Sequence, residues 1–258
     1  MGVLTVRFYA ELNDFLPPES RARRVVRHFD VIGSVKDFIE SLGVPHPEVD
    51  LVLVNGESVD FFHLLRDRDD VSVYPVFESF DISSVSRVRP TPLRNLRFVL
   101  DVHLGKLAAY LRMAGFDALY AKQASDRELA GVVAAEQRVL LTRDRYLLMR
   151  SEVKRGYWIR STVPRQQLIE VLQRFHLAGA VRPFTRCMEC NAVLERVGRD
   201  AVADKLPPAV AAQKWTIHRC PGCGRIYWKG SHHARMQKLL DSTLAMLDKD
   251  EKFSPRRA

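Results

Sequence analysis

The four cysteines of the chain form two Cys-x-x-Cys pairs, Cys187 with Cys190 and Cys220 with Cys223. Structural Zn²⁺ is held tetrahedrally by four ligands, and a Cys-x-x-Cys turn lets two thiolates reach the same ion. Because four thiolates fill every ligand position, water has no place on the ion, and a catalytic role for it is the weaker interpretation. The spacing therefore predicts a closed zinc site that stabilises the fold around it.

A disulfide role for these cysteines is the alternative. The sequence shows no other cysteine and no secretory segment, and both features favour a reducing compartment in which thiols persist. We therefore expect a cytoplasmic protein. No apolar run approaches the roughly 18 residues that a membrane-spanning helix requires, so we expect no membrane partner.

Three aspartates stand at the ends of expected secondary-structure elements. Asp101 and Asp144 each follow an apolar strand pattern, over residues 97–100 and 138–142, and Asp126 lies in the first turn of an expected helix. Ligands of open α/β sheets gather beyond the carboxyl ends of the strands, so we expect the three carboxylates to converge there. They would repel one another unless a divalent cation lay between them, and Mg²⁺ and Mn²⁺ prefer such oxygen ligands. The placement predicts metal-dependent phosphodiester chemistry.

Each of these acids also has a structural alternative. Asp101 could be the N-cap of the helix that follows it. Ser125 and Glu128 have the spacing of a capping box, and Asp126 stands in the same first turn, where negative charge is favourable without any metal. We favour the capping role for Glu128, and we place Asp117, at the start of a strand, outside the metal site.

Basic residues near the acids are candidates for binding phosphate. Arg143 and Arg145 flank Asp144, and their guanidinium groups suit phosphate binding better than packing. Together with Lys106, they are the residues that we expect to steady a substrate phosphate.

The charge of the chain is distributed unevenly. The first 80 residues carry 8 Lys and Arg against 14 Asp and Glu, a net charge of −6, whereas the remainder carries 32 against 17, a net charge of +15. Lys and Arg neutralise phosphates and release condensed counterions, so the basic part favours a polyanionic partner, with nucleic acid as the leading candidate. The alternative is a basic surface that serves solubility alone.

The first 80 residues have the pattern of a β-grasp domain. Leu4, Val6 and Phe8 alternate with polar residues, which is the period of a half-buried strand. The expected elements are strands over residues 3–9 and near 25–26, a helix that begins after the N-cap Ser34 and ends at Gly43, a strand over 51–54 that runs into the Asn55-Gly56 turn, and a strand over 71–77. Beyond Arg97, strand and helix patterns alternate, which is the order that builds a parallel sheet.

The segments VRFYAEL, LVLVNGESVD and LLRDRDDVSVYPV resemble the small sulfur-carrier branch of the ubiquitin-like proteins. Those carriers end in a Gly-Gly whose carboxylate is activated, whereas this chain continues past Val76. The resemblance therefore implies a binding, regulatory or structural module without carrier chemistry, which could contact a protein partner.

The segments RFVLDVHLGKLAAYLRMAGFDALY, SDRELA, RVLLTRDR and CPGCGRIYWKGSHHARM, together with the two cysteine pairs, resemble the Mut-seven C-terminal RNase domain family over about residues 96–245. The resemblance implies a PIN-like nuclease fold with an appended zinc ribbon, in some members preceded by a ubiquitin-like domain. It also implies that Asp101, Asp126 and Asp144 bind Mg²⁺ or Mn²⁺. PIN nucleases commonly have a fourth acid, for which this sequence shows no clear counterpart.

The segment from Tyr227 to His233 mixes aromatic, basic and hydroxyl groups, which can stack a base and hold a phosphate of single-stranded RNA. In the alternative interpretation Ser231 caps the last helix and Trp228 packs into the core. We favour capping for Ser231, while the family resemblance favours a substrate-binding role for His232.

We therefore expect an α/β protein with a PIN-like parallel-sheet domain and a C-terminal zinc ribbon, preceded by a β-grasp ubiquitin-like domain. Its expected parts are the β-grasp domain (1–80), a linker (81–95), the catalytic domain (96–182), the ribbon (183–230) and a C-terminal helix and tail (231–258). The expected function is metal-dependent hydrolysis of RNA, with tRNA or another structured RNA as the candidate substrate. The alternative is a non-catalytic RNA- or ribosome-binding protein.

Overall fold

The computed structural model describes residues 2–30, 33–75, 82, 84–88, 96–211, 213 and 215–253. Its backbone forms two compact units: unit 1 is Met1–Leu96 with Ala124–Trp158, and unit 2 is Arg97–Gln123 with Ile159–Ala258. The linker expected over residues 81–95 lies largely outside the described residues, as does the end of the strand expected over 71–77. The domain boundaries expected from the sequence stay predictions.

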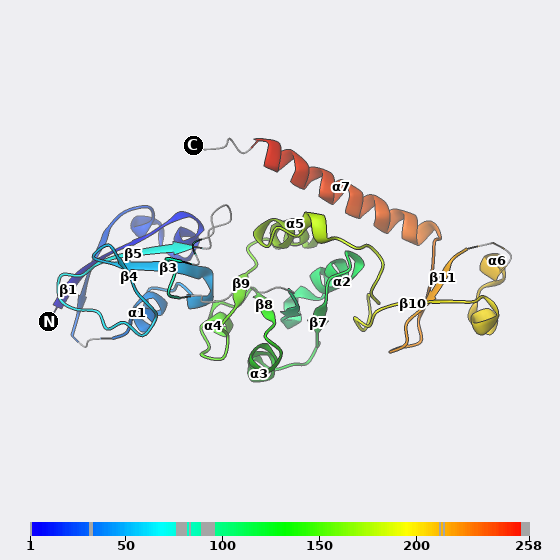
Figure 1. Ribbon diagram of the computed structural model, residues 1–258, viewed down its shortest axis with the longest axis horizontal. Helices are drawn as coiled ribbons and strands as arrows, with labels where there is room; N and C mark the ends of the chain where they lie inside the picture. The colour runs from blue at the N-terminus through cyan, green and yellow to red at the C-terminus, as the bar shows by residue number, and fades with distance from the viewer. Residues whose placement is uncertain are drawn as a thin grey trace. The chain divides into compact units, whose positions relative to one another are not determined.

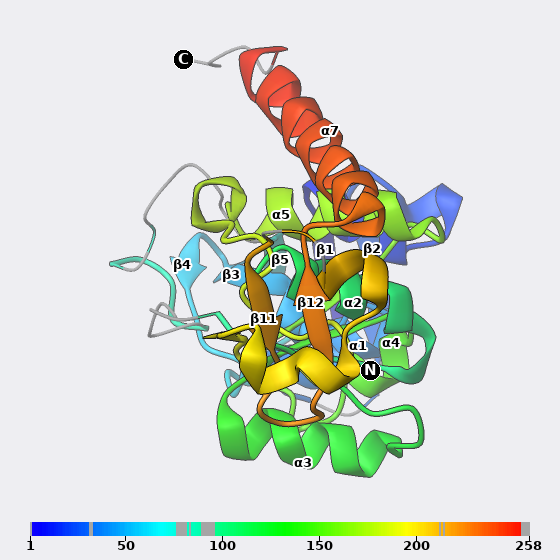
Figure 2. The ribbon, with the colours of Figure 1, turned by 90° about the vertical axis from the view of Figure 1, so that its right-hand side faces the viewer.

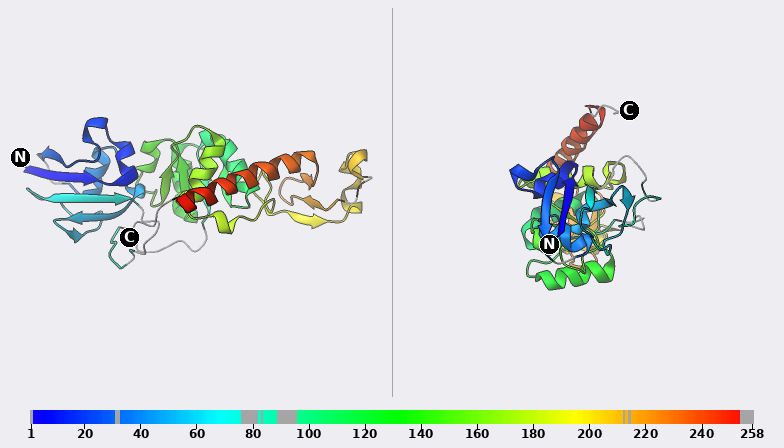
Figure 3. Two further views of the ribbon diagram at one scale, coloured as in Figure 1. Left: turned by 90° about the horizontal axis from the view of Figure 1, so that it is seen from above. Right: turned by 90° about the vertical axis from the view of Figure 1, so that its left-hand side faces the viewer.

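The first part of unit 1 is a five-stranded sheet, drawn in blue to cyan in Figure 1. Its strands are β1 (Gly2–Phe8), β2 (Val25–Phe29), β3 (Val49–Val54), β4 (Glu57–Ser58) and β5 (Asp70–Pro75), in the order β2-β1-β5-β3-β4. β1 and β5 are parallel, and the other pairs are antiparallel. Figure 3 (left) shows this sheet in blue to cyan. This topology confirms the predicted β-grasp domain.

The core of this domain follows from the alternation in β1. Leu4, Val6 and Phe8 are buried and pack in one cluster with Val35 and Ile39 of the helix α1 (Val35–Ser41). Three short 3₁₀ helices, η1 (Ala10–Phe15), η2 (Pro18–Ser20) and η3 (His46–Glu48), connect the strands and the helix. The period-2 pattern therefore places the apolar face of the sheet against the helix.

Local signals set the ends of these elements as the sequence predicts. The side chain of Ser34 accepts a hydrogen bond from the N–H of Asp37 at 3.2 Å and so caps α1. Gly43 follows the helix with φ +88°, a left-handed conformation that costs glycine little. Asn55 (φ +52°) and Gly56 (φ +87°) both have positive φ, as a tight hairpin turn requires.

The second part of unit 1 alternates helices and strands. Its elements are α3 (Asp126–Glu136), β8 (Val139–Thr142), α4 (Arg145–Leu148) and β9 (Gly156–Trp158). β8 and β9 are parallel, with Leu140 opposite Gly156. Every residue of β8 is buried, as is typical of a parallel strand covered on both faces.

Unit 2 begins with the same kind of alternation. Its first elements are β6 (Phe98–Leu100), η4 (Val102–Leu104), α2 (Gly105–Met113) and β7 (Ala118–Tyr120), followed after residue 158 by α5 (Pro164–Arg174) and η5 (Ala178–Ala180). β6 and β7 are parallel, with Phe98 opposite Ala118. The predicted α/β region with parallel strands is thereby confirmed.

The cysteine-bearing part of unit 2 is a small antiparallel sheet. It consists of β10 (Glu195–Val197), β11 (Ile217–Arg219) and β12 (Ile226–Trp228), and the segment between β10 and β11 carries η6 (Asp200–Lys205) and α6 (Pro208–Ala211). Figure 2 shows β11 and β12 side by side, with β12 leading into the long helix α7 (Ser231–Phe253). A small core of Val202, Leu206 and Ile217 supports this sheet.

The helix α7 packs against α5 within unit 2. Leu240 and Leu247 are buried, and the guanidinium of Arg165 donates hydrogen bonds to Ser242 at 2.9 Å and to Thr243 at 3.4 Å. α7 starts at Ser231 itself, and the carbonyl of Gly230 accepts the first helical hydrogen bond from Ala234, so the predicted capping role of Ser231 is wrong. Within the described part of the chain, no helix combines the length and the apolar character that a membrane crossing requires.

Candidate metal centres

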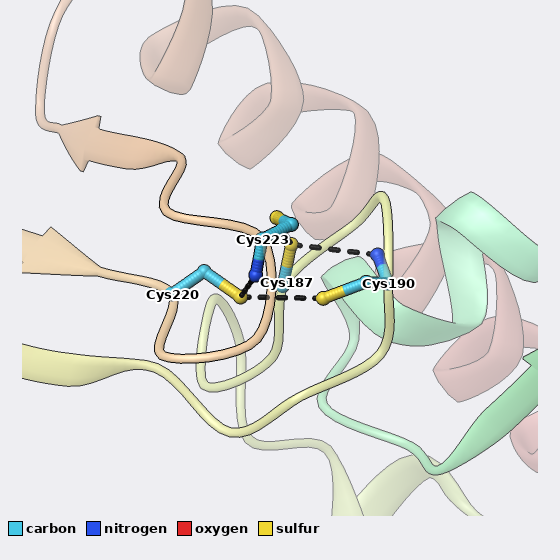
Figure 4. Close-up of side chains that lie close together, drawn as sticks. All are labelled: Cys187, Cys190, Cys220 and Cys223. Carbon is cyan, nitrogen blue, oxygen red and sulfur yellow. Dashed lines mark hydrogen bonds between the residues drawn. The ribbon is translucent and has the colours of Figure 1, made fainter.

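Two loops bring the four cysteines together. The sulfurs of Cys187 and Cys223 lie 3.5 Å apart, those of Cys190 and Cys220 lie 3.2 Å apart, and all four lie within 4.8 Å of one another (Figure 4). In each loop the N–H of the second cysteine points at the sulfur of the first, at 3.5 Å in the first loop and 3.4 Å in the second. Such N–H groups stabilise thiolates, so the loops can hold a metal ion with four sulfur ligands.

The chemistry of these donors fits zinc. All four cysteines are free thiols, so the disulfide alternative does not describe this structure. Burial favours the neutral form of Cys187, but hydrogen bonds from the Tyr227 hydroxyl and from the N–H groups of Cys190 and Glu189 outweigh it and lower its pKa to about 6. Cys187 is therefore held as a thiolate at neutral pH, which is the form of cysteine that binds a metal. The Tyr227 hydroxyl lies 3.1 Å from the Cys187 sulfur, so it supports the cysteine cluster.

A buried arginine ties the first cysteine loop to the α/β elements of unit 2. Arg112 of α2 is 3% exposed, and its guanidinium donates to the carbonyl of Ala118 at 2.7 Å and to those of Met188 and Glu189 at 3.1 and 2.8 Å. Burial lowers the pKa of Arg112. Three carbonyl groups from two separate segments therefore depend on one side chain.

Asn191 makes a second connection of the same kind. Its amide oxygen accepts a hydrogen bond from the N–H of Ala118 at 3.1 Å, and its amide nitrogen donates to Asp117 at 2.8 Å. Asp117 also lies 3.5 Å from Arg186, the residue before Cys187. Asp117 thus fixes the cysteine loop beside β7.

The structure gives Asp101 and Asp144 capping roles. Asp101 follows β6, is 4% exposed, and accepts a hydrogen bond from the N–H of His103 at 2.8 Å. Asp144 follows β8, and its Oδ1 accepts from Tyr146 at 2.8 Å and from Leu147 at 3.4 Å. The N-cap alternative for Asp101 is confirmed. A metal site of the expected kind prefers oxygen ligands, and both carboxylates supply oxygen.

Asp126 and Glu128 differ in role within the first turn of α3. Ser125 donates hydrogen bonds to Oε2 of Glu128 from its N–H at 2.7 Å and from its hydroxyl at 2.8 Å, which confirms the predicted capping box. Asp126 is exposed at the first position of the helix. Asp101 belongs to unit 2, whereas Asp126 and Asp144 belong to unit 1. The convergence of these three carboxylates on one ion stays a prediction.

The predicted phosphate-binding residues have different surroundings. Lys106 of α2 and His232 of α7 are exposed, and Arg143 is half-buried, with its carbonyl accepting a hydrogen bond from the Trp158 indole at 3.1 Å. The guanidinium of Arg145 packs against two aromatic rings, a packing role that the sequence analysis missed. Contact between these four residues and a substrate stays a prediction.

The sequence did not reveal three residues that support the cysteine cluster, namely Tyr227, Arg112 and Asn191. The sequence places Tyr227 in a segment that could bind RNA, whereas its hydroxyl contacts Cys187. One signal was available for Asn191, because it directly follows a Cys-x-x-Cys pair and has φ +71°, a left-handed conformation that asparagine adopts more readily than most residues.

The fold and site define a class of protein with a β-grasp domain, an α/β region with parallel strands, and a four-cysteine cluster in a small antiparallel sheet. The family model described as "Mut7-C RNAse domain" matches residues 96–240, and the one described as "Mut7-C ubiquitin" matches residues 1–81. The chain belongs to the Mut7-C RNAse domain family.

Two solved structures from Haloferax volcanii are similar to part of the chain. SAMP1 is 19% identical with a TM-score of 0.25, covering 31% of this chain and 100% of its own. Small archaeal modifier protein 1 is 19% identical with a TM-score of 0.24, covering 29% of this chain and 98% of its own. No curated protein matches the chain.

Proposed function

We propose that the protein is a PIN-like ribonuclease that hydrolyses RNA phosphodiester bonds with Mg²⁺ or Mn²⁺. The observation that carries this proposal is the match of the Mut7-C RNAse domain to residues 96–240. The placement of Asp101 directly after β6 and of Asp144 just after β8 supports it, because ligands bind at the carboxyl ends of parallel strands.

In this proposal Asp101, Asp126 and Asp144 hold the divalent ion. The ion would supply a Lewis acid for the phosphate and lower the pKa of a water molecule. The backbone N–H groups of Tyr146 and Leu147 fix Oδ1 of Asp144, which orients the other oxygen of that carboxylate. Lys106 and Arg143 would contact the substrate phosphate, and their positive charge would favour the approach of RNA.

The zinc ribbon and the β-grasp domain have supporting roles in the proposal. The four-cysteine cluster would bind zinc for structural stability, and the basic ribbon would aid RNA binding. The β-grasp domain would be the part of the chain that contacts a protein partner. We place the protein in the cytoplasm, where its thiols would stay reduced.

Two isosteric substitutions test the proposed function. In Asp101→Asn and Asp144→Asn the asparagine keeps the N-cap and removes the negative charge, so folding should be retained. We expect Mn²⁺-dependent cleavage of a labelled RNA to fall at least about 1,000-fold, while zinc content and RNA affinity stay at the parent values. Asp200→Asn, which removes an exposed acid from η6, is the matched control. Parent-level cleavage by either variant would refute the assignment.

Measuring both RNA binding and RNA cleavage by the same protein distinguishes a ribonuclease from a non-catalytic RNA- or ribosome-binding protein. A binding protein would retain RNA without cleaving it, in the presence or absence of Mn²⁺. A ribonuclease would release products whose amount depends on both time and Mn²⁺ concentration.

A further inference from the structure

An open groove of about 1170 Å³ lies within unit 2, along the ribbon sheet and the first turns of α7. Its lining residues are drawn from the segments 183–194 and 216–237, together with Ala109 and Lys205. Figure 2 shows how β12 leads directly into α7 at this place. Small-molecule sites enclose about 300–1,000 Å³, so an open groove of this size suits an extended chain better than a small ligand.

The charged side chains of the groove are mainly basic. They are Arg186, Lys205, Arg225 and Lys229, with Glu189 as the acid among the lining residues. Arg225 and Glu189 form an exposed ion pair at 3.4 Å, so these two charges largely offset each other. Lys205 and Lys229 are exposed and remain to attract an anionic chain.

An indole ring lies among these cations. Trp228 lines the groove, is half-buried, and comes immediately before Lys229. A Cβ atom at Gly230 would lie 2.9 Å from the indole nitrogen of Trp228, so the absence of a side chain at Gly230 lets the ring lie against the backbone. Such an anchored ring can stack a base without losing much conformational freedom on binding.

Phe184 supplies a second aromatic ring to the groove, and its backbone has a positive φ. Its φ is +56°, a left-handed conformation that is uncommon and unfavourable for a bulky side chain. Its N–H donates to the carbonyl of Met113, and its ring centroid lies 4.1 Å from that of His233, which also lines the groove. The fold thus holds Phe184 in a strained conformation that presents an aromatic surface at the groove.

We propose that this groove binds an unpaired segment of RNA, with Lys205 and Lys229 contacting its phosphates and Trp228 stacking on a base. The choice of RNA rests on the proposed ribonuclease function. An acidic peptide would use the lysines alone, whereas cations beside the half-buried Trp228 ring match the alternation of phosphate and base. A base-paired helix would leave Trp228 unused, because its bases are already stacked.

Direct binding measurements test the proposal without any cleavage. The full chain with zinc bound is titrated into a fluorescein-labelled 12-nucleotide oligouridylate, without Mg²⁺ or Mn²⁺, and anisotropy is recorded between 50 and 300 mM KCl. We expect Lys205→Ala combined with Lys229→Ala to weaken binding at least tenfold at low salt and to reduce the slope of log K against log salt by about 1.4. Trp228→Leu should weaken binding about 5- to 150-fold and leave that slope unchanged.

Matched variants control for charge and for glycine replacement. Lys122→Ala combined with Lys238→Ala removes the same charge from exposed residues of unit 2 that lie outside the ribbon and do not line the groove, and this variant should bind RNA as the parent does. Gly230→Ala should weaken binding by displacing the indole, whereas Gly179→Ala, where a Cβ meets nothing within 4 Å, should not.

The outcomes separate this proposal from the proposed function. If both the double lysine variant and Trp228→Leu bind the oligouridylate as tightly as the parent, the proposal that the groove binds RNA is wrong, even if the protein cleaves RNA. Equal competition by polyglutamate, or equal affinity for a 12-base-pair RNA duplex, would likewise overturn it. Loss of binding in these variants would support the groove even if no cleavage occurs.

Discussion

The guanidinium carbon of Arg145 lies 4.3 Å from the ring centroid of Trp158 and 5.1 Å from that of Phe15. Its nitrogens also donate hydrogen bonds to the carbonyls of Phe15 at 3.3 Å and Asp14 at 3.5 Å. Phe15 belongs to the β-grasp domain, and Arg145 directly follows Asp144. Within unit 1, the β-grasp domain therefore helps to hold the turn that presents Asp144.

Replacement of Arg145 should destabilise unit 1. Arg145→Ala removes two cation–π contacts and two hydrogen bonds, and we expect the free energy of unfolding to fall by about 2 kcal/mol in urea denaturation followed by circular dichroism. Arg127→Ala, at an exposed position of α3, should change it by less than about 0.5 kcal/mol. A double-mutant cycle with Trp158→Leu should give a coupling energy of about 1 kcal/mol, and a coupling near zero would show that the contact does not stabilise the protein.

Removal of one hydroxyl should weaken the zinc site without breaking it. Tyr227→Phe keeps the ring but removes the hydrogen bond to the Cys187 sulfur, so we expect zinc affinity to fall about 10- to 100-fold while one zinc per chain still binds at saturation. Competition with a chromogenic chelator measures the affinity, and mass spectrometry of the metal measures the stoichiometry. Tyr120→Phe, whose hydroxyl donates to the carbonyl of Val102, is the matched control. Equal affinities in the two variants would contradict the supporting role of Tyr227.

The sequence predicted the elements that local chemistry determines. The Ser34 and Ser125 caps, the Asn55-Gly56 turn and the paired cysteines each involve neighbouring residues, and the structure shows all of them. Strand and helix order followed from apolar periodicity for the same reason. The sequence did not predict the strand β9, because three residues are too few to establish a period.

Contacts between distant residues could not be predicted in this way. Arg145 is separated from Phe15 by 130 residues, and Arg112 from Met188 by 76. The position of Arg145 beside Asp144 indicates a phosphate ligand. Nothing nearby in the sequence shows that the rings of Phe15 and Trp158 pack against its guanidinium. Which of the candidate acids and bases meet a substrate is likewise a property of tertiary structure.

Replacement of Arg112 should destabilise unit 2, because its buried guanidinium connects the first cysteine loop to β7. Arg112→Gln leaves the carbonyls of Ala118, Met188 and Glu189 short of donors, and we expect the free energy of unfolding to fall by about 3 kcal/mol or more. Lys106→Gln removes the same charge from an exposed position of α2 and should have an effect below about 0.5 kcal/mol. Equal stability of these two variants in urea would show that Arg112 is dispensable.

Substitution of Asp126 and of Glu128 tests which of these two neighbouring acids binds the metal ion. We expect Asp126→Asn to reduce Mn²⁺-dependent RNA cleavage at least about 100-fold, because it removes a proposed ligand of the ion. Glu128→Gln should retain cleavage, since Glu128 is engaged with Ser125. The reverse result, with cleavage lost in Glu128→Gln and kept in Asp126→Asn, would exchange the two assignments.

The capping role of Glu128 also has a pH signature. A hydrogen bond from the N–H of Ser125, followed by one from its hydroxyl, lowers the pKa of Glu128 in the folded protein. The carboxylate form therefore stabilises the fold above the unfolded-state pKa of about 4.3, and this contribution disappears as the pH falls through the lowered pKa. The difference in free energy of unfolding between the parent and Glu128→Gln should accordingly be constant from pH 7 to pH 6 and shrink below about pH 4.3. A difference that grows on acidification would mean that the hydrogen bonds favour the protonated acid, which contradicts the capping box.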